Sequence, residues 1–95
     1  MIHVSVKLLG EYAKSADGPV LLELEESSVV SDLVEALFSL LSNGFKDSFM
    51  DPRVQNLSQR SLVLVRGVEI GVLSGLKTVL RDLDEVLVIP VSHGG

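Results

Sequence analysis

The sequence predicts an α+β fold in which one main helix packs on a mixed sheet of four or five strands. Residues 2–9 alternate between apolar and polar side chains, which is typical of a strand with one buried face. Between Val30 and Leu41 apolar residues recur with the helical period and form one stripe. The run VLVIPV at 86–91 is continuously apolar, as in a central strand that is covered at least partly on both faces.

The N-terminal part of the chain predicts a β-hairpin. A second alternating segment at 20–25 follows the first strand closely in sequence. The connection GEYAKSADGP is rich in turn-forming residues, and we expect one helical turn at 11–15 within it.

The main helix is predicted at 29–43. Ser28 is the expected N-cap, and Asp32 is placed near the positive end of the helix dipole. The dipeptide Asn43-Gly44 is the expected C-terminal stop. The apolar stripe of this helix has to cover the sheet.

The segment 45–60 has no clear period, and sixteen structureless residues are uncommon in a compact domain. We therefore expect a short helical turn there, with Phe45, Phe49 and Met50 packed against the core.

The C-terminal third predicts the remaining strands. Residues 61–66 form an apolar strand, and Arg66-Gly67 predicts a tight turn into a return strand at 68–70. Residues 71–78 are expected to form a loop before the last strand.

Composition excludes several classes of function. The chain carries 13 acidic and 8 basic residues, a net charge of −5, which disfavours direct binding to nucleic acid. It has no cysteine, which excludes disulfides, zinc–cysteine sites and a thiol nucleophile. The sequence has no apolar run long enough to span a membrane and no secretory signal, so we expect a cytoplasmic protein.

The usual catalytic motifs are absent from the sequence. It contains neither a phosphate-binding glycine motif nor a nucleophile elbow or a zinc-protease helix. Asp82 and Asp84 are expected to bond nearby amides in a turn rather than to act as acid and base. His3 is expected to point away from the core, and no metal site is predicted.

The C-terminal residues VSHGG are the strongest candidate for a functional group. Only Ser92 and His93 separate the last predicted strand from Gly94 and Gly95. Glycine lacks a Cβ, so such a backbone can enter a narrow channel of another protein closely. A carboxylate is a poor acyl donor and needs activation, for example by ATP. Glycine-rich ends also occur without function, and the two glycines alone do not decide between these interpretations.

The order of elements, the stretch VLRDLDEVLVIP and the ending HGG together resemble the β-grasp sulfur carriers and ubiquitin-like modifiers. This family includes MoaD (the small subunit of molybdopterin synthase), ThiS, the archaeal small modifier proteins and the ubiquitin-related modifier that thiolates tRNA. The resemblance covers nearly the whole chain and is strongest over 60–95. It implies a ubiquitin-like β-grasp domain at 1–91 and a flexible Gly-Gly tail at 92–95.

The resemblance also implies a mechanism and partners. An E1-like activating enzyme adenylates the carboxylate of Gly95 with ATP. A sulfur donor, either a sulfurtransferase or a desulfurase, then converts it to a thiocarboxylate, or a lysine of a target protein is joined to it. The sulfur acceptor is a tRNA thiolase or the large subunit of molybdopterin synthase. The protein itself is a carrier rather than an enzyme and binds no cofactor. The activating enzyme is expected to grip Val91, Ser92, His93 and Gly94.

The sequence departs from the family pattern at Leu83, where the family usually has a glycine between two aspartates. Leucine does not adopt a positive φ cheaply, so we expect this turn to differ or to need no such conformation. The ending with His93 and the long segment 45–60 are closer to the ubiquitin-related modifier than to MoaD.

A carrier needs a docking surface, and the consecutive apolar residues Leu62, Val63, Leu64 and Val65 are the candidates. Two of the four must face away from the helix, either towards a partner or beneath the segment 45–60. Three other functions stay open: a MoaD-type synthase subunit only, a β-grasp interaction module with incidental glycines, and an enzyme subunit whose chemistry the sequence does not show.

Overall fold

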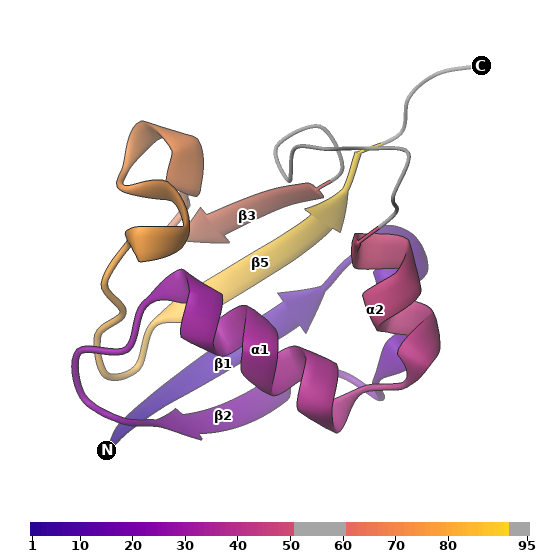
Figure 1. Cartoon of the computed structure of the whole chain (residues 1–95), viewed down its shortest axis with the longest axis horizontal. Coiled ribbons are helices and arrows are strands. Elements are labelled where there is room, and N and C mark those ends of the chain that lie inside the picture. The colour runs from indigo at the N-terminus through magenta and orange to yellow at the C-terminus, as the bar shows by residue number, and fades with distance from the viewer. Residues whose placement is uncertain (51–60, 92–95) are drawn as a thin grey trace.

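The computed structural model describes residues 1–50 and 61–91, and these residues form a two-layer α+β fold. A five-stranded mixed sheet has the order β2-β1-β5-β3-β4, and helices α1 and α2 cover one of its faces (Figure 1). The strands are β1 (Ile2–Leu8), β2 (Val20–Leu24), β3 (Ser61–Val65), β4 (Val68–Glu69) and β5 (Glu85–Pro90), and the helices are α1 (Val30–Leu40) and α2 (Asn43–Phe49). The predicted fold class is confirmed.

The last strand is central, as its continuous apolar sequence predicts. β5 runs parallel to β1 on one side and antiparallel to β3 on the other. β1 and β2 form the predicted antiparallel hairpin, and the 3-10 turn η1 (Gly10–Ser15) lies between them. Because β1 and β5 are parallel, the N-terminal end of β1 and the C-terminal end of β5 lie at opposite ends of the sheet.

Helix α1 is shorter than predicted, and its N-terminus is capped differently. Ser28 is not the N-cap, since its hydroxyl donates a hydrogen bond to the Glu25 carbonyl at 2.7 Å. Val29 occupies the cap position, and its N–H donates to Asp32 Oδ2 at 2.9 Å. Asn43, which we expected to stop the helix, instead begins α2.

Helix α2 supplies the helical turn predicted within 45–60, and it completes an aromatic cluster. Phe45 and Phe49 are buried and pack with Phe38 and Tyr12, and the Tyr12 and Phe45 ring centroids are 5.3 Å apart. The prediction was wrong for Met50, which is exposed immediately after the helix. The rest of that predicted segment, residues 51–60, lies outside the described residues.

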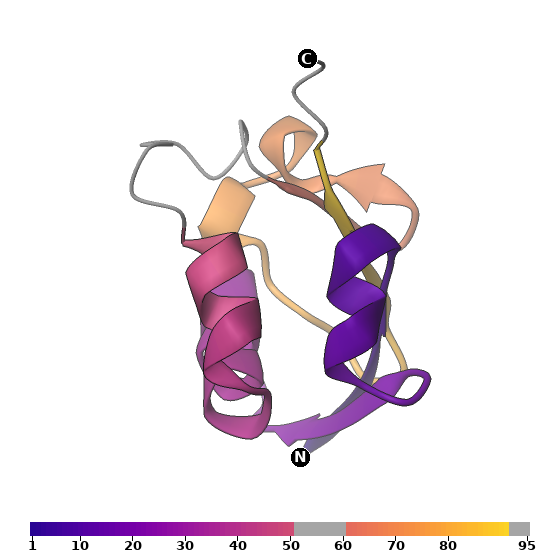
Figure 2. The ribbon, with the colours of Figure 1, turned by 90° about the vertical axis from the view of Figure 1, so that its right-hand side faces the viewer.

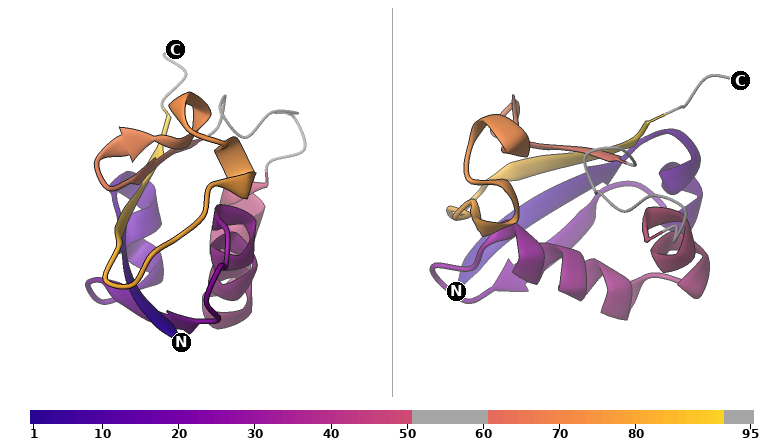
Figure 3. Two further views of the ribbon diagram at one scale, coloured as in Figure 1. Left: turned by 90° about the vertical axis from the view of Figure 1, so that its left-hand side faces the viewer. Right: turned by 45° about the horizontal axis from the view of Figure 1, so that its top comes forward.

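The core lies between the inner face of the sheet and the helices (Figure 2). Its buried apolar residues come from every second position of β1, β3 and β5 and from the stripe of α1, and they include Val4, Val6, Leu33, Leu37, Val63, Val65, Val86 and Val88. From β4 the chain passes through the 3-10 turns η2 (Ile70–Val72) and η3 (Gly75–Lys77) towards the start of α1, where the Val30 N–H donates to the Thr78 carbonyl (Figure 3). Within the described part of the chain, no helix has both the length and the apolar character needed to cross a membrane.

Candidate functional site at the end of β5

The base of the Gly-Gly tail is the end of β5, which is held on both sides by neighbouring strands. Pro90 is the Cα partner of Ser61 on β3, and Val88 is the partner of Leu8 on β1. The half-buried Val91 follows directly. The other predicted tail residues, Ser92, His93, Gly94 and Gly95, lie outside the described residues, so their roles and the division between domain and tail stay predictions.

The turn η1 packs against the last residues of β5. The Leu9 N–H donates to the Val88 carbonyl at 3.0 Å. Gly10 has a φ of +57°, and a Cβ built on it would lie 2.8 Å from Pro90 Cγ. A side chain at this position would therefore collide with the base of the tail.

The outer face of β3 and β5 carries an apolar patch near the end of β5, formed by Leu62, Leu64, Leu87 and Ile89. Two cross-strand pairs build it, because Leu62 pairs with Ile89 and Leu64 with Leu87. Leu62 is 38% exposed and the other three are half-buried. We call these four residues the tail-side patch.

The structure corrects half of the predicted partner surface. Leu62 and Leu64 do face away from the helices, whereas Val63 and Val65 point into the core and are 3% and 0% exposed. The sequence analysis missed Leu87 and Ile89. The signal was present in the run at 86–91, since a strand with one open face presents every second residue of such a run to that face.

The residues before β5 form a tight turn, as predicted, and Asp84 bonds an amide of that turn, whereas Asp82 bonds an amide of β1. Asp82 Oδ1 accepts from the His3 N–H at 2.7 Å, and Asp84 Oδ2 accepts from the Arg81 N–H at 2.8 Å. Asp84 is nearly buried and is also paired with the Arg66 side chain. The carboxylates are therefore engaged in the turn rather than placed for acid–base chemistry.

The hydrogen bond from the His3 N–H lowers the pKa of Asp82 below its ordinary value. The His3 ring is exposed, as predicted, and lies 3.5 Å from Asp82 and 3.7 Å from Glu23. Among the described residues, no group of three or more histidine and carboxylate side chains is arranged to hold a metal ion.

Comparison with known proteins identifies the architecture. No protein-family model matches the chain, and no curated protein does. Among solved structures, the small archaeal modifier protein 1 of Methanosarcina acetivorans is similar with a TM-score of 0.79 and 27% identity, over 100% of this chain and 98% of that one. The chain has the ubiquitin-like β-grasp fold.

Two further neighbours come from the same group of β-grasp proteins. Urm1 of Trypanosoma brucei has a TM-score of 0.72 and 28% identity, over 98% of this chain and 95% of that one. A Pyrococcus furiosus protein described as a molybdopterin converting factor, subunit 1, has a TM-score of 0.74 and 23% identity, over 97% of this chain and 100% of that one. The predicted resemblance to the ubiquitin-like sulfur carriers and modifiers is confirmed.

Within this β-grasp fold, Leu83 contradicts our expectation. We expected the turn to differ from that of the family or to need no positive φ, because leucine replaces the family's usual glycine. Instead, Leu83 has a φ of +67° and is 78% exposed. The Asp84 N–H still bonds the Arg81 carbonyl, and the Leu83 N–H bonds the His3 carbonyl at 2.7 Å. These bonds and those of the two aspartates fix the turn and impose the left-handed conformation on a side chain that does not favour it.

Proposed function

We propose that this chain is a ubiquitin-like carrier whose Gly95 carboxylate is adenylated by an E1-like activating enzyme and then converted to a thiocarboxylate or joined to a lysine. The observation that supports this most strongly is the position of Gly-Gly, a few residues beyond a central strand that pairs with β1 up to Val88 and with β3 up to Pro90. The likeness to a small archaeal modifier protein and to Urm1 supports the same function.

The chemistry follows from the weakness of a carboxylate as an acyl donor. A Gly95 oxygen attacks the α-phosphorus of ATP, pyrophosphate leaves, and an acyl-adenylate forms. A terminal persulfide sulfur of the donor protein then attacks the acyl carbon and AMP leaves. A thiol cleaves the resulting acyl disulfide to leave the thiocarboxylate. When a lysine amine attacks instead, AMP leaves and an isopeptide bond forms. In either route this chain supplies the substrate and the activating enzyme supplies the ATP site.

The fold contributes position rather than catalytic groups. β5 and the η1 contact hold Pro90, so the fold fixes the point after which the Gly-Gly sequence follows. The tail-side patch provides an apolar surface beside that point, and we assign it to docking of the activating enzyme.

A mass measurement tests the central step. The protein is incubated with its E1-like enzyme, ATP and a sulfur donor, after its intact mass has shown that Gly95 is the terminal residue. We expect the mass increase of one oxygen-to-sulfur exchange, and no increase for a chain that lacks Gly95. An unchanged mass, with an enzyme preparation that modifies a control carrier, contradicts the proposal.

A variant of the tail-side patch tests the docking assignment separately. Leu62→Ser should raise the concentration of carrier at which activation is half-maximal and leave the maximal rate nearly unchanged. Leu40→Ser on α1, an exposed leucine of the opposite layer, is the matched control. Equal effects of the two variants would refute the docking role and leave the chemistry at Gly95 intact.

The acceptor of the sulfur is a separate question. The carrier in its thiocarboxylate form can be presented to a tRNA thiolase with its tRNA, and to the large subunit of molybdopterin synthase with its pterin precursor. Disappearance of the thiocarboxylate with only one of them assigns the pathway. Lysine conjugation is tested by intact-mass analysis of target proteins.

A further inference from the structure

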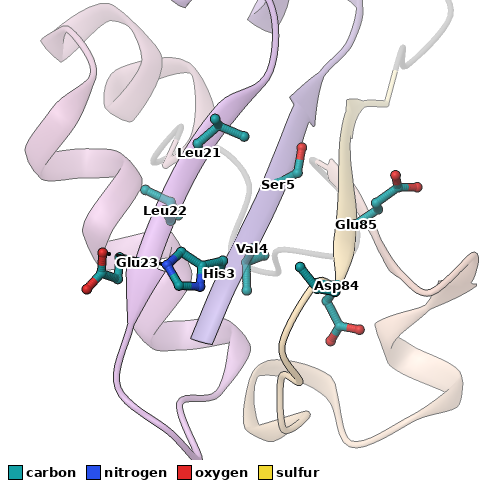
Figure 4. A pocket seen from close by; sticks show the side chains of 9 residues that line it. His3, Val4, Ser5, Leu21, Leu22, Glu23, Asp84 and Glu85 are labelled. Atoms are coloured by element: carbon teal, nitrogen blue, oxygen red, sulfur yellow. Dashed lines mark ion pairs between the residues drawn. The ribbon is translucent and has the colours of Figure 1, made fainter. Parts of the chain in front are cut away.

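The outer face of the sheet carries a second surface, at the end of the sheet opposite to Pro90, and Figure 4 shows side chains that line it. It is a groove of about 510 Å³, formed by the first residues of β1, the outer side of β2 and the turn that leads into β5. Three of its lining residues lie side by side on neighbouring strands, because Ser5 on β1 is the Cα partner of both Leu21 on β2 and Glu85 on β5. We call it the turn-side groove.

Two leucines that line the turn-side groove are almost fully exposed. Leu21 on β2 is 79% exposed and Leu83 in the turn is 78% exposed. Each lies on the outer face or its rim, so neither contributes to the core between the sheet and the helices. Two such side chains around one groove form an apolar site that the isolated fold does not use.

Leu83 adds a second, independent observation. Its φ of +67° is unfavourable for leucine, and glycine would hold the same turn without that cost. Its side chain gains little burial in return. A residue that is strained and also exposed points to a role for its side chain outside the folded monomer.

The charges around the turn-side groove indicate the chemistry of the occupant. Among the described residues, Glu23, Asp84 and Glu85 line it, and neither lysine nor arginine does. Arg66 already pairs with Asp84, whereas Glu23 and Glu85 remain exposed at the groove. The His3 ring lies 3.7 Å from Glu23 and 3.5 Å from Asp82. A partner that places an apolar side chain between the leucines and basic side chains beside the carboxylates complements this site.

From these features we propose that the turn-side groove binds a basic protein segment, in which an apolar side chain enters between Leu21 and Leu83 and flanking Lys or Arg residues pair with Glu23 and Glu85. A second copy of this chain is disfavoured as the occupant, since each copy would present the same carboxylates and a net charge of −5. Anionic lipid and nucleic acid are disfavoured by the same charges. The proposal does not depend on the chemistry at Gly95.

The test selects binders without a prior choice of partner. A phage library of random 12-residue peptides is panned on the full chain, and clones that also bind the double variant Leu21→Ser/Leu83→Gly are removed. Recovered peptides are synthesised, and their affinities are measured by titration with NMR detection of the backbone amides. Leu83→Gly is the central variant because it removes the side chain and relieves the strain at once, so that a loss of binding cannot arise from unfolding.

The proposal expects peptides that combine an apolar residue with Lys or Arg and that shift the amide signals of His3, Ser5, Leu21 and Glu85. Leu83→Gly and Leu21→Ser should each weaken binding about tenfold or more, and Leu40→Ser and Leu62→Ser should not. Added salt should weaken binding further. A chain lacking Gly95 should bind as tightly as the full chain, which separates this result from that of the thiocarboxylate experiment.

Three results would overturn it. The first is a selection that yields no peptide dependent on Leu21 and Leu83. The second is a consensus that is acidic or apolar without basic residues. The third is dimerisation of the chain, seen by sedimentation and abolished by Leu83→Gly, which would assign the groove to a second copy.

Discussion

Gly10 lies directly against Pro90, so the turn after β1 touches the last residue of β5. The gap leaves no room for a Cβ, which would lie 2.8 Å from Pro90 Cγ, and Gly10 has a φ of +57°. The proline ring cannot rotate away as a flexible side chain could. This contact fixes the residue from which the tail extends, at a point far from the turn-side groove.

Gly10→Ala should therefore destabilise the fold by about 2–4 kcal/mol, the sum of a left-handed alanine and an overlap with a rigid ring. Gly75→Ala is the matched control, because Gly75 has a φ of +58° and no atom within 4 Å of a built Cβ. It should cost only about 1 kcal/mol. Urea unfolding of both variants measures the difference, and equal losses would show that the Pro90 contact contributes nothing.

Leu83→Gly should stabilise the protein by about 0.5–1 kcal/mol. The relief of a left-handed leucine, about 1–2 kcal/mol, is partly offset by the greater freedom of glycine in the unfolded chain. Little burial is lost, since Leu83 is 78% exposed. Leu83→Ala keeps the positive φ and should leave stability nearly unchanged. A lower midpoint of urea unfolding for Leu83→Gly than for the unaltered protein would show that the leucine side chain stabilises the monomer.

The protein should become less stable in acid because protonation of Asp82 removes its contribution to the free energy of unfolding. The His3 N–H bond lowers its folded pKa, so its contribution is full above the unfolded value of about 4 and is lost as pH falls through the lower folded pKa. The difference in free energy of unfolding between the protein with Asp82 and the Asp82→Asn variant should be constant near neutral pH. It should shrink below about pH 4. Both proteins carry His3→Gln, which keeps the backbone donor and removes the imidazole that lies beside Asp82. A difference that does not change with pH refutes this role.

Periodic patterns of apolar residues predicted most of the fold. The predictions that were wrong concern the ends of α1, where several local signals for a helix end compete. The alternation of 2–9 and the stripe from Val30 to Leu41 identified β1 and α1 because each has one buried face. Asn43 failed as a stop signal because the chain turns there directly into a second helix. Ser28 failed as a cap because its hydroxyl bonds the Glu25 carbonyl.

Only part of the candidate site could be predicted from the sequence, because the rest depends on contacts between residues far apart in the chain. Sequence indicated the base of the tail at the end of a central strand, and the structure places Pro90 there between β3 and η1. The sequence did not reveal the turn-side groove, since Leu21 and Leu83 are 62 positions apart and line one groove only because the fold brings β2 and the turn before β5 to β1. The positive φ of Leu83 could not be predicted from the sequence either, because hydrogen bonds to the distant His3 impose it.

The hydrogen bond between the Tyr12 hydroxyl and Ser61 Oγ, 2.6 Å long and buried, connects η1 to the residue of β3 that faces Pro90. Tyr12→Phe should lower the free energy of unfolding by about 1–3 kcal/mol, because it leaves the buried Ser61 hydroxyl without its phenol partner. Ser61→Ala should lower it by a similar amount. The double variant should cost clearly less than the sum, with a coupling of about 1 kcal/mol or more, since replacing both partners leaves no unpaired polar group. Urea unfolding of the four proteins measures the coupling. Strict additivity would mean that the two hydroxyls are satisfied independently and that the bond does not support the base of the tail.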